Sequence, residues 1–409
     1  METQQQPVRT PLEGIRVLEL GNFIAAPSAG RLLAEFGAEV IKVEEPGTGD
    51  QVRDWRLFRG ETSMMWRTLG RNKKSITIDV RTEQGQELVR LLAGQVDVVL
   101  ENYRPGKLES WHLSPDELRR DNAQLVVVRI SGYGQTGPYR DRPGFGGVAE
   151  AMGGLRFITG YPDRPPTRLG ASIGDTLAGL YAVIGALMGL QSRDRGLLDA
   201  GETVDVALTE AVYSVMESFI PEYTAYGNIR SRTGNEMPGV APSNTYPCGD
   251  GEWVVIGGNA DGIFHRLMTA IGRTDLAADK RFHDNSGRAT NSKLLDDAIA
   301  SWTSERTLSD VMEVMVAASV PAGPIYSAAD ITRDPHFRDR GMLLEMEVEV
   351  EEGKPEPVTF PGIVPKLDRL PGRVNWLGPE LGEHTHQILS GLLNLDEREI
   401  AELREGRIV

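Results

Sequence analysis

A single carboxylate stands inside the stretch ASIGDTLAGLYA, which covers residues 171–182. Asp175 follows Gly174 and precedes an apolar segment that continues through VIGALMGL. Asp is a preferred residue at helix N-termini, because its side chain accepts hydrogen bonds from free backbone N–H groups and its charge is stabilised by the helix dipole. The same surroundings would hold a carboxylate ionised and oriented for chemistry. Helix capping and catalysis are therefore both open at this position.

Two basic stretches could bind an anionic ligand. RNKKS, residues 71–75, begins a predicted strand, and ENYRPGK, residues 101–107, follows another. The carboxyl ends of parallel strands line the ligand crevice of an α/β sheet, which favours Asn102, Tyr103 and Arg104 as contacts to a phosphorylated ligand. A solvated strand end is the competing interpretation.

Three arginines precede Asp175 in the loop-like stretch GGLRFITGYPDRPPTRLGASIGD, namely Arg156, Arg164 and Arg168. Arginine is common on solvated loops. A guanidinium can also hold a carboxylate through two parallel hydrogen bonds. Arg168, just ahead of LGASIGD, is the first choice for such a contact.

Other motifs argue against a dinucleotide site and a metal site. GYGQTG, residues 132–137, matches G-x-G-x-x-G after a predicted strand, but the prolines of PYRDRPGF prevent the prompt helix start that a dinucleotide site requires. His384 and His386 are two positions apart, which places them on different faces of a helix. Cys248 is the only cysteine and has no neighbouring His, so we expect neither a metal site nor a disulfide within the chain.

The elements that would position these residues alternate between strand and helix. IRVLEL (15–20) and AEVIKVEE (38–45) flank a helix with Pro27 in its first turn and Gly37 at its end. Further strands are predicted in KSITIDV, VDVVLEN, AQLVVVRIS and TVDVAL, and SPDEL offers a capping box. Continuous apolar strands separated by helices indicate an α/β fold with a doubly wound, mostly parallel, Rossmann-like sheet over residues 11–220.

The pattern changes beyond residue 225. TYPCGDGEWVVIGG predicts a hairpin, and three helical patterns ending at SVPAGPIYS complete a smaller α+β domain over residues 225–335. Two β-like runs around EEGKPE and helices beginning at LGEHTHQIL make up a C-terminal segment, residues 336–409.

Charge and composition narrow the partners and the compartment. The net charge of -15 at pH 7 would repel nucleic acid and anionic membranes, so we expect neither as a partner. METQQQPVRTPLEG lacks the apolar core of a signal peptide, and the apolar run over residues 176–190 is shorter than the ~20 residues that span a bilayer. That run predicts a buried helix, and the single cysteine favours a cytoplasmic protein.

The chain resembles class III CoA-transferases, a family that includes formyl-CoA:oxalate, carnitine and succinyl-CoA:dicarboxylate enzymes. Ten segments fall in the family's order: PLEGIRVLEL, the loop ending AAP, GAEVIKVEEPGTGD, RNKKSITIDV, VVLENYRPG, GYGQTGPY, IGDTLAGLYA, VPAGPIYS, DPHF and LGEHT. The resemblance implies a chain that passes from the large domain to the small one and back, in an interlaced homodimer. It also implies acyl-CoA and carboxylic acid substrates, with coenzyme A as a cosubstrate and no tightly bound cofactor.

The family's nucleophile lies in the segment that matches IGDTLAG, which gives this role to Asp175. The resemblance implies that the carboxylate attacks an acyl-CoA thioester to give a mixed anhydride, and that CoA thiolate returns to form an aspartyl-CoA thioester. The acceptor acid then runs the sequence in reverse. Each exchange is close to thermoneutral, so no ATP or metal is required.

By the same resemblance, CoA lies along the loop NFIAAP, the strand start RNKKS and the loop ENYRPG. The implied contacts are Ile24, Ala25, Arg71, Asn72, Lys73, Asn102, Tyr103 and Arg104. An arginine that follows the second strand in the formyl-CoA enzymes is replaced here by Glu45, which implies a different hold on the adenine end. The glycine run of those enzymes has no counterpart in RTGNEMPGVAPSNTY, which argues against oxalate and formyl-CoA as substrates.

The stretch before Asp175 is more similar to the succinyl-CoA:dicarboxylate members. This implies that Arg168, with Arg156, holds the distal carboxylate of a C4 to C6 diacid. The resemblance therefore predicts succinyl-CoA as the donor and a malate-, citramalate-, itaconate- or glutarate-type acid as the acceptor.

Two alternatives to a CoA-transferase stay open on the sequence. An acyl-CoA racemase of the same fold would need an acid–base His in the segment that reads RPGFGGVAEA here, and that segment has none. A non-catalytic acyl-CoA-binding subunit would work with a different partner chain, although it would have no need of Asp175.

Overall fold

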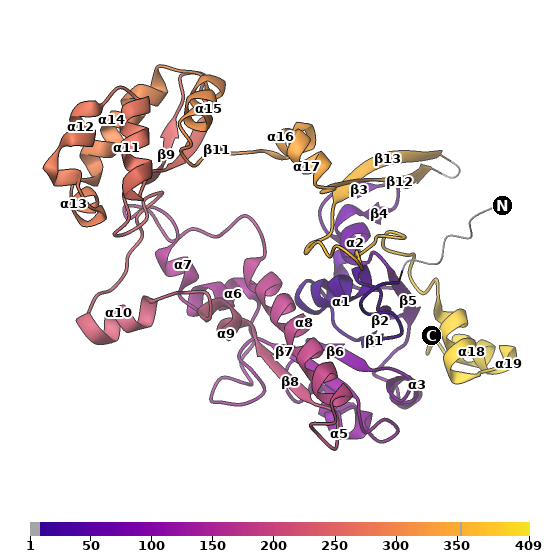
Figure 1. Ribbon diagram of the computed structural model, residues 1–409. Helices are drawn as coiled ribbons and strands as arrows, with labels where there is room; N and C mark the ends of the chain where they lie inside the picture. The colour runs from indigo at the N-terminus through magenta and orange to yellow at the C-terminus, as the bar shows by residue number, and fades with distance from the viewer. Residues whose placement is uncertain (1–8, 352–353) are drawn as a thin grey trace. The chain divides into compact units, whose positions relative to one another are not determined.

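The structure is a computed structural model that describes residues 9–351 and 354–409. The described chain forms two compact units (Figure 1). The large unit takes in the chain up to Arg156, then Arg168–Phe219 and Arg340–Val409. The small unit takes in Phe157–Thr167 and Ile220–Asp339. The chain therefore leaves the large unit and later returns to it.

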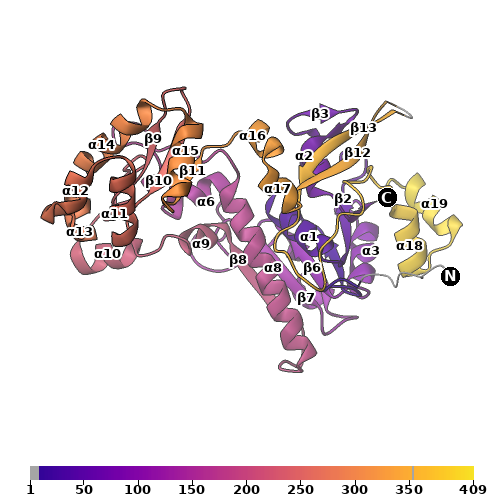
Figure 2. The same ribbon diagram turned by 45° about the horizontal axis from the view of Figure 1, so that its top comes forward.

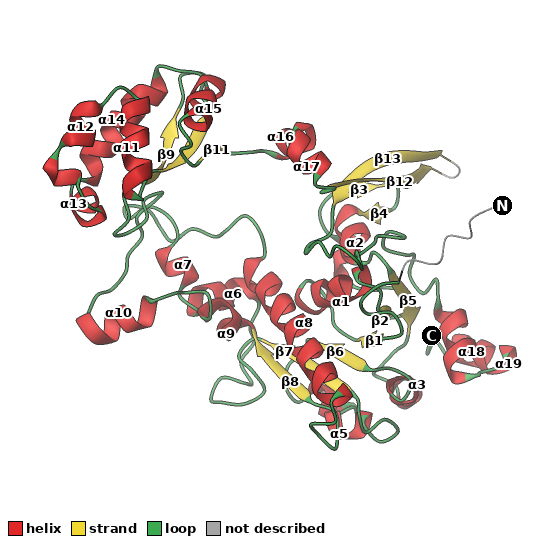
Figure 3. Ribbon diagram, viewed as in Figure 1, coloured by secondary structure: helices red, strands yellow, loops and turns green. Residues whose placement is uncertain are grey.

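The central sheet of the large unit consists of β1 (Arg16–Glu19), β2 (Glu39–Glu44), β5 (Lys73–Thr77), β6 (Val98–Glu101), β7 (Val126–Ser131) and β8 (Thr203–Ala207). These six strands are parallel and lie in the order β5-β2-β1-β6-β7-β8 (Figure 3). The order of the strands switches between β1 and β6, so the loops that follow these two strands diverge at the carboxyl edge, where α/β sheets bind ligands. The predicted α/β class and parallel sheet are confirmed.

Helices cover both faces of this sheet. One face packs on α1 (Ala25–Glu35) and α8 (Ile173–Asp194), and the other packs on α3 (Glu83–Ala93). Val17 and Leu18 enter different cores, because successive side chains of a strand point to opposite faces. The side chain of Thr82 accepts the backbone N–H of Gly85 and so caps α3. The sheet is doubly wound.

The segment that follows the small unit completes the second of these cores. Ile388 from α18 (Thr385–Leu393) and Ile400 from α19 (Glu397–Glu405) are buried there with residues of β6 and α3. The backbone N–H of Asp79 also donates to the carbonyl of Ile408 at 2.7 Å. The two ends of the described chain therefore belong to one structural unit.

Helix α8 is longer than the apolar run from which it was predicted, and it is buried along one face. Ala178, Ala182 and Ala186 are fully buried. The backbone of α1 lies so close that a Cβ on Gly179 would come within 2.9 Å of the Ala25 carbonyl oxygen, and the two helices run side by side in Figure 1 and Figure 2. The opposite face exposes Leu180, Tyr181, Ile184, Leu187 and Met188. The prediction of a buried helix is right for one face and wrong for the other.

Helix α8 is long and apolar enough to cross a membrane. Among the helices of residues 9–351 and 354–409, it alone meets these two criteria. Its small residues are committed to packing on α1 and β7. This core position accounts for the small apolar residues on its buried face.

The large unit contains further helices and strands around this sheet. They include η1 (Gln51–Asp54), β3 (Phe58–Arg59), β4 (Thr62–Ser63), α2 (Met64–Leu69), α4 (Lys107–Ser110), α5 (Pro115–Leu118), α6 (Gly146–Met152), α9 (Leu208–Tyr213), β12 (Leu343–Glu351) and β13 (Lys354–Pro361). Ser114 and Glu117 form the predicted capping box at α5. The predicted β-like runs around EEGKPE pair as the antiparallel ladder β12–β13. Two of the four points where the chain passes between the units lie in short helices, α7 (Leu155–Ile158) and α10 (Phe219–Tyr226).

The small unit has a three-stranded antiparallel sheet, β9 (Ser243–Pro247), β10 (Trp253–Gly257) and β11 (Ala322–Pro324). Its helices are α11 (Asp261–Ala270), α12 (Thr274–Ala278), α13 (Asn285–Thr290), α14 (Ser292–Ser304), α15 (Leu308–Ala317), α16 (Ala328–Arg333) and α17 (Pro335–Asp339), with the turn η2 (Lys280–Phe282). The predicted hairpin is confirmed, with Gly251 at φ +89° in its turn. The three helical patterns expected before β11 become five helices, since α12 and α13 are too short to show an apolar period.

Candidate active site

Asp175 lies in the first turn of α8, and Ser172 takes the N-cap position. A helix N-terminus favours a negative charge. Burial, together with the charge of Glu150, nevertheless raises the pKa of Asp175 to about 6, and the charge of Arg168 opposes them. Desolvation therefore outweighs the effect of the helix terminus on this pKa. The result is a carboxylate that is ionised at neutral pH and more basic than an ordinary aspartate.

Glycines on both sides bring backbone up to this carboxylate. A Cβ on Gly146, the first residue of α6, would lie 2.1 Å from Asp175 Oδ2. A Cβ on Gly174 would lie 3.0 Å from the Gly146 carbonyl oxygen. The start of α6 therefore packs directly on the start of α8, and side chains at these two glycines would displace the carboxylate.

Asp175 opens into a cavity of about 130 Å³ at the carboxyl edge of the sheet. The cavity is lined by residues that follow β1, β6 and β7, together with the first residues of α1 and α9. The predicted residues that it brings together with Asp175 are Ala25, Asn102, Tyr103 and Arg104. Ile24 precedes Ala25, is buried, and does not line the cavity. This is the switch point of the strand order, where the fold is expected to hold a ligand.

The loops after β1 and β6 are tied to each other. The backbone N–H of Asn22 donates to Asn102 Oδ1 at 2.8 Å, and Asn102 Nδ2 donates to the carbonyl of Asn22 at 2.7 Å. The side-chain amide of Asn102 therefore holds the two loops together. Its contact with a ligand stays a prediction. Phe23, at φ +65°, donates its backbone N–H to Asp50 Oδ1 at 3.1 Å.

A buried ion network lies under the same loop. Lys42 Nζ lies 2.8 Å from Asp50 Oδ2 and 3.3 Å from Glu19 Oε1, and it donates to the carbonyl of Gly21. Burial alone would lower the pKa of Lys42, but Asp50 and Glu19 overcome it and raise the pKa. Buried charges are stable only when paired and hydrogen-bonded, as they are here. The network holds in place the loop after β1, which lines one side of the cavity.

The predicted contacts in RNKKS lie elsewhere. Arg71 is fully buried, with Nε 2.5 Å from Glu35 Oε1 and Nη1 2.7 Å from the carbonyl of Pro361. Asn72 Nδ2 donates to the carbonyl of Arg373 at 2.6 Å. Lys73 Nζ lies 2.7 Å from Glu19 Oε2, and burial lowers the pKa of Lys73 to about 8.

This placement corrects the expectation for all three residues. They stand at the amino end of β5, whereas the ligand edge is formed by the carboxyl ends of the strands. Their hydrogen bonds go to the buried carboxylates Glu35 and Glu19, to carbonyls of α1 and to the returning C-terminal segment. Arg104, in contrast, is exposed and lines the cavity.

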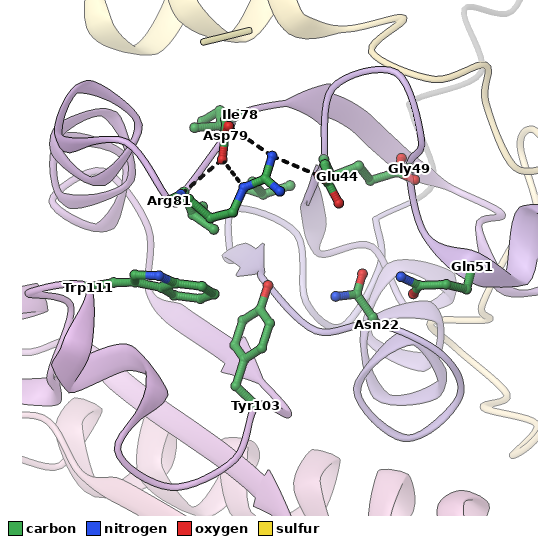
Figure 4. A pocket seen from close by; sticks show the side chains of 12 residues that line it. Asn22, Glu44, Gly49, Gln51, Ile78, Asp79, Arg81, Tyr103 and Trp111 are labelled. Carbon is green, nitrogen blue, oxygen red and sulfur yellow. Dashed lines mark hydrogen bonds and ion pairs between the residues drawn. The ribbon is translucent and has the colours of Figure 1, made fainter. Parts of the chain in front are cut away.

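A second cavity of about 130 Å³ lies beyond Tyr103 (Figure 4). Tyr103 and Trp111 meet edge to face in its floor, with ring centroids 5.0 Å apart. Arg81 lies across from the two rings and pairs with Glu45 at 2.8 Å and with Asp79 at 2.8 Å. Since Tyr103 lines both cavities, it separates the Asp175 site from a site with two aromatic rings and one guanidinium.

The arginines before Asp175 differ in their surroundings. Arg156 Nη2 donates to Glu150 Oε2 at 3.1 Å, so its charge is already engaged. Arg168 is exposed, and its charge lowers the pKa of Asp175 against the effect of burial. Arg164 lies in the small unit, 5.9 Å from the centroid of the Tyr161 ring.

Sequence reasoning missed three residues of the site. Arg142 lines the Asp175 cavity and stacks at 3.6 Å on the ring of Tyr139. Glu150 is buried behind Asp175, and Arg81 lies in the second cavity. The usable signal for Arg142 is an arginine close to GYGQTGPY in an acidic chain.

Comparison with known proteins gives a consistent result. The model of CoA-transferase family III matches residues 12–385. The succinyl-CoA–D-citramalate CoA-transferase of Chloroflexus aurantiacus is 50% identical over 409 residues, which is 100% of both chains. The succinyl-CoA–L-malate CoA-transferase alpha subunit of Chloroflexus aurantiacus is 38% identical, over 98% of this chain and 92% of its own. The succinate–glutarate CoA-transferase of Agrobacterium fabrum is 34% identical, over 95% of this chain and 97% of its own.

A solved structure agrees with these relatives. The crystal structure of a CAIB/BAIF family protein from Brucella suis superposes with a TM-score of 0.81 at 35% identity. It covers 94% of this chain and 100% of that chain.

Proposed function

The chain belongs to CoA-transferase family III and is a CoA-transferase, and we propose that it moves CoA from succinyl-CoA to a dicarboxylate through covalent intermediates on Asp175. One observation carries the proposal: the family's reactive segment puts a half-buried carboxylate into a cavity that also contains Arg104 and Arg142. The relatives named above for succinyl-CoA and a dicarboxylate support the substrate class.

In the proposed first step, an Asp175 carboxylate oxygen attacks the thioester carbonyl of succinyl-CoA. An O–C bond forms, the C–S bond breaks, and CoA leaves as the thiolate with the electron pair. The thiolate then attacks the aspartyl carbonyl of the mixed anhydride and releases succinate. The acceptor carboxylate enters by the reverse of these steps. A carboxylate with a raised pKa is a stronger nucleophile than an ordinary aspartate and is still ionised at neutral pH.

We propose that CoA runs from the Asp175 cavity past Tyr103 into the cavity of Figure 4. Arg104 would neutralise phosphate charge near Tyr103. The adenine end would meet Tyr103, Trp111 and Arg81. The Arg81 guanidinium comes from the loop after β5 and pairs with Glu45, so it supplies the positive charge that position 45 lacks. This path uses the exposed cation Arg104 in place of the buried Arg71 and Lys73.

The acceptor's distal carboxylate is assigned to Arg168. This arginine is exposed, and its charge acts on Asp175. Arg156 is held by a buried carboxylate, so it is the weaker candidate for this contact.

We also propose a cytoplasmic homodimer of interlaced subunits, with functional domains over residues 11–220, 225–335 and 336–409. The exposed apolar side chains of α8 support a partner on that face, since such patches on soluble proteins mark contacts. A second, different subunit remains the alternative, because the malate relatives carry the names of alpha and beta subunits.

The test uses the purified chain alone. Succinyl-CoA is offered with citramalate, malate, itaconate, glutarate, acetate or butyrate, and acyl-CoA products are separated by chromatography. We expect transfer to at least one diacid, and a loss of several orders of magnitude in Asp175→Asn, which keeps the shape and removes the nucleophile. Asp175→Asn with near wild-type turnover would end the proposed mechanism. Activity only after adding a second chain would support the two-subunit alternative.

A further inference from the structure

A second buried carboxylate lies behind the nucleophile. Glu150 of α6 is 2% exposed, and its Oε2 accepts from Arg156 Nη2 at 3.1 Å. Its Oε1 is buried and has no hydrogen-bond partner in residues 9–351 and 354–409, and the same holds for Arg156 Nε. An incompletely satisfied buried charge costs free energy, so a side chain of this kind calls for an explanation.

The geometry of α6 directs Glu150 toward Asp175. Gly146 and Glu150 are four residues apart and share one face of the helix. Gly146 packs on the Asp175 carboxylate, as its 2.1 Å approach shows. The Cγ of Glu150 lies 3.5 Å from the position of a Cβ on Gly174, the neighbour of Asp175. Glu150 therefore faces the first turn of α8, where α6 lies beside it (Figure 1).

We propose that Glu150, anchored by Arg156, is a positioning residue whose negative charge drives Asp175 out of its free carboxylate form and into the covalent intermediates. The proposal rests on the proposed function. Two like charges in a partly desolvated site repel each other. Attack on the thioester moves the charge of Asp175 onto the departing thiolate, so the repulsion is relieved as the O–C bond forms and the C–S bond breaks. Arg156 pairs with Glu150, with Nη2 3.1 Å from Oε2.

Other charges near Asp175 act in the opposite sense. Arg168 precedes α8, and Arg104 and Arg142 line the cavity. The neighbouring helices α1 and α9 contribute Ala25 and Leu208 to the lining. Within the described residues, Glu150 is the acidic side chain whose charge adds to burial in raising the pKa of Asp175.

Glu150→Gln separates this electrostatic role from a packing role, because Gln keeps the shape and an oxygen acceptor for Arg156. We expect kcat for succinyl-CoA transfer to fall about tenfold with an unchanged KM, and the acid limb of the pH profile to move down by up to about one unit. The covalent aspartyl-CoA species, measured by mass spectrometry after acid quench, should accumulate less. Glu150→Asp, which retains the charge, should restore part of kcat.

The matched control is Glu210→Gln on α9, which removes one exposed carboxylate and should leave kcat and the acid limb unchanged. A Glu150→Gln enzyme with wild-type kcat and acid limb overturns the proposal while the proposed function stands. If that variant does not fold, Glu150→Gln/Arg156→Gln, which exchanges both charges for amides, carries the same expectation and the same refutation. A wild-type chain without transfer to any acid would refute the proposed function, and the role of Glu150 with it.

Discussion

Gly146→Ala should slow the enzyme strongly by adding one methyl group. The new carbon would lie 2.1 Å from Asp175 Oδ2 and 2.6 Å from its Cγ. Comfortable contact needs about 3.5 Å, so the carboxylate or the start of α6 must move by more than about 1 Å. A displacement of about 1 Å in a reacting group costs on the order of 10²-fold in rate. We therefore expect kcat/KM for succinyl-CoA transfer to fall by about that factor.

The neighbouring glycine supplies the control. A Cβ on Gly147 would have Arg156 Nη2 as its nearest atom, at 3.5 Å, which is ordinary contact. Gly147→Ala should therefore keep wild-type kcat/KM. Steady-state transfer assays on both variants, with thermal unfolding to show that each is folded, decide the matter. Wild-type kcat/KM in Gly146→Ala would refute the reasoning that the α6 backbone fixes the nucleophile.

Substitution of an arginine that lines a cavity should weaken ligand binding, whereas substitution of a buried arginine outside the cavities should lower stability. Arg104→Ala should weaken binding of CoA esters by ~1–3 kcal/mol in calorimetric titration, as for a lost charge-assisted contact. Arg71→Ala should instead lower the free energy of unfolding in urea by about 3 kcal/mol, because it leaves the buried Glu35 with only the longer 3.4 Å contact to Arg31. The opposite pattern would return Arg71 to the ligand. Arg168→Ala should abolish the preference for diacids over butyrate in competition assays, and an intact preference would move the distal carboxylate to another residue. kcat/KM should fall as the pH drops through about 6, because protonated Asp175 cannot attack and its raised pKa lifts this limit; an acid limb near pH ~4, the ordinary aspartate value, would contradict the burial of the nucleophile.

Local patterns in the sequence predict much of the fold. The apolar runs of β6 and β7, the Thr82 cap of α3 and the Ser114–Glu117 box depend on residues close together in the chain. Asp175 was found because its segment matches a family motif, and its position in the first turn of α8 follows from the same run of residues. Its raised pKa could not be read in this way, since the burial depends on α6.

Properties that depend on contacts between residues far apart in the chain could not be predicted from the sequence. A stretch such as RNKKS looks like an anion site until Glu35 and Glu19, 36 and 54 residues away, are seen to neutralise Arg71 and Lys73. Glu150 looks like an ordinary polar residue of a short helix until α6 is packed on α8. The exposed half of α8 was missed because composition does not tell which face of a helix is covered.

The paired hydrogen bonds between Asn22 and Asn102 set a limit on how such an enzyme can diversify. Both bonds use the backbone of Asn22, so residue 22 could change its side chain and keep the tie. A single residue inserted into either loop would shift that backbone and break both bonds at once. Substrate range should therefore evolve by exchanging side chains on loops of constant length.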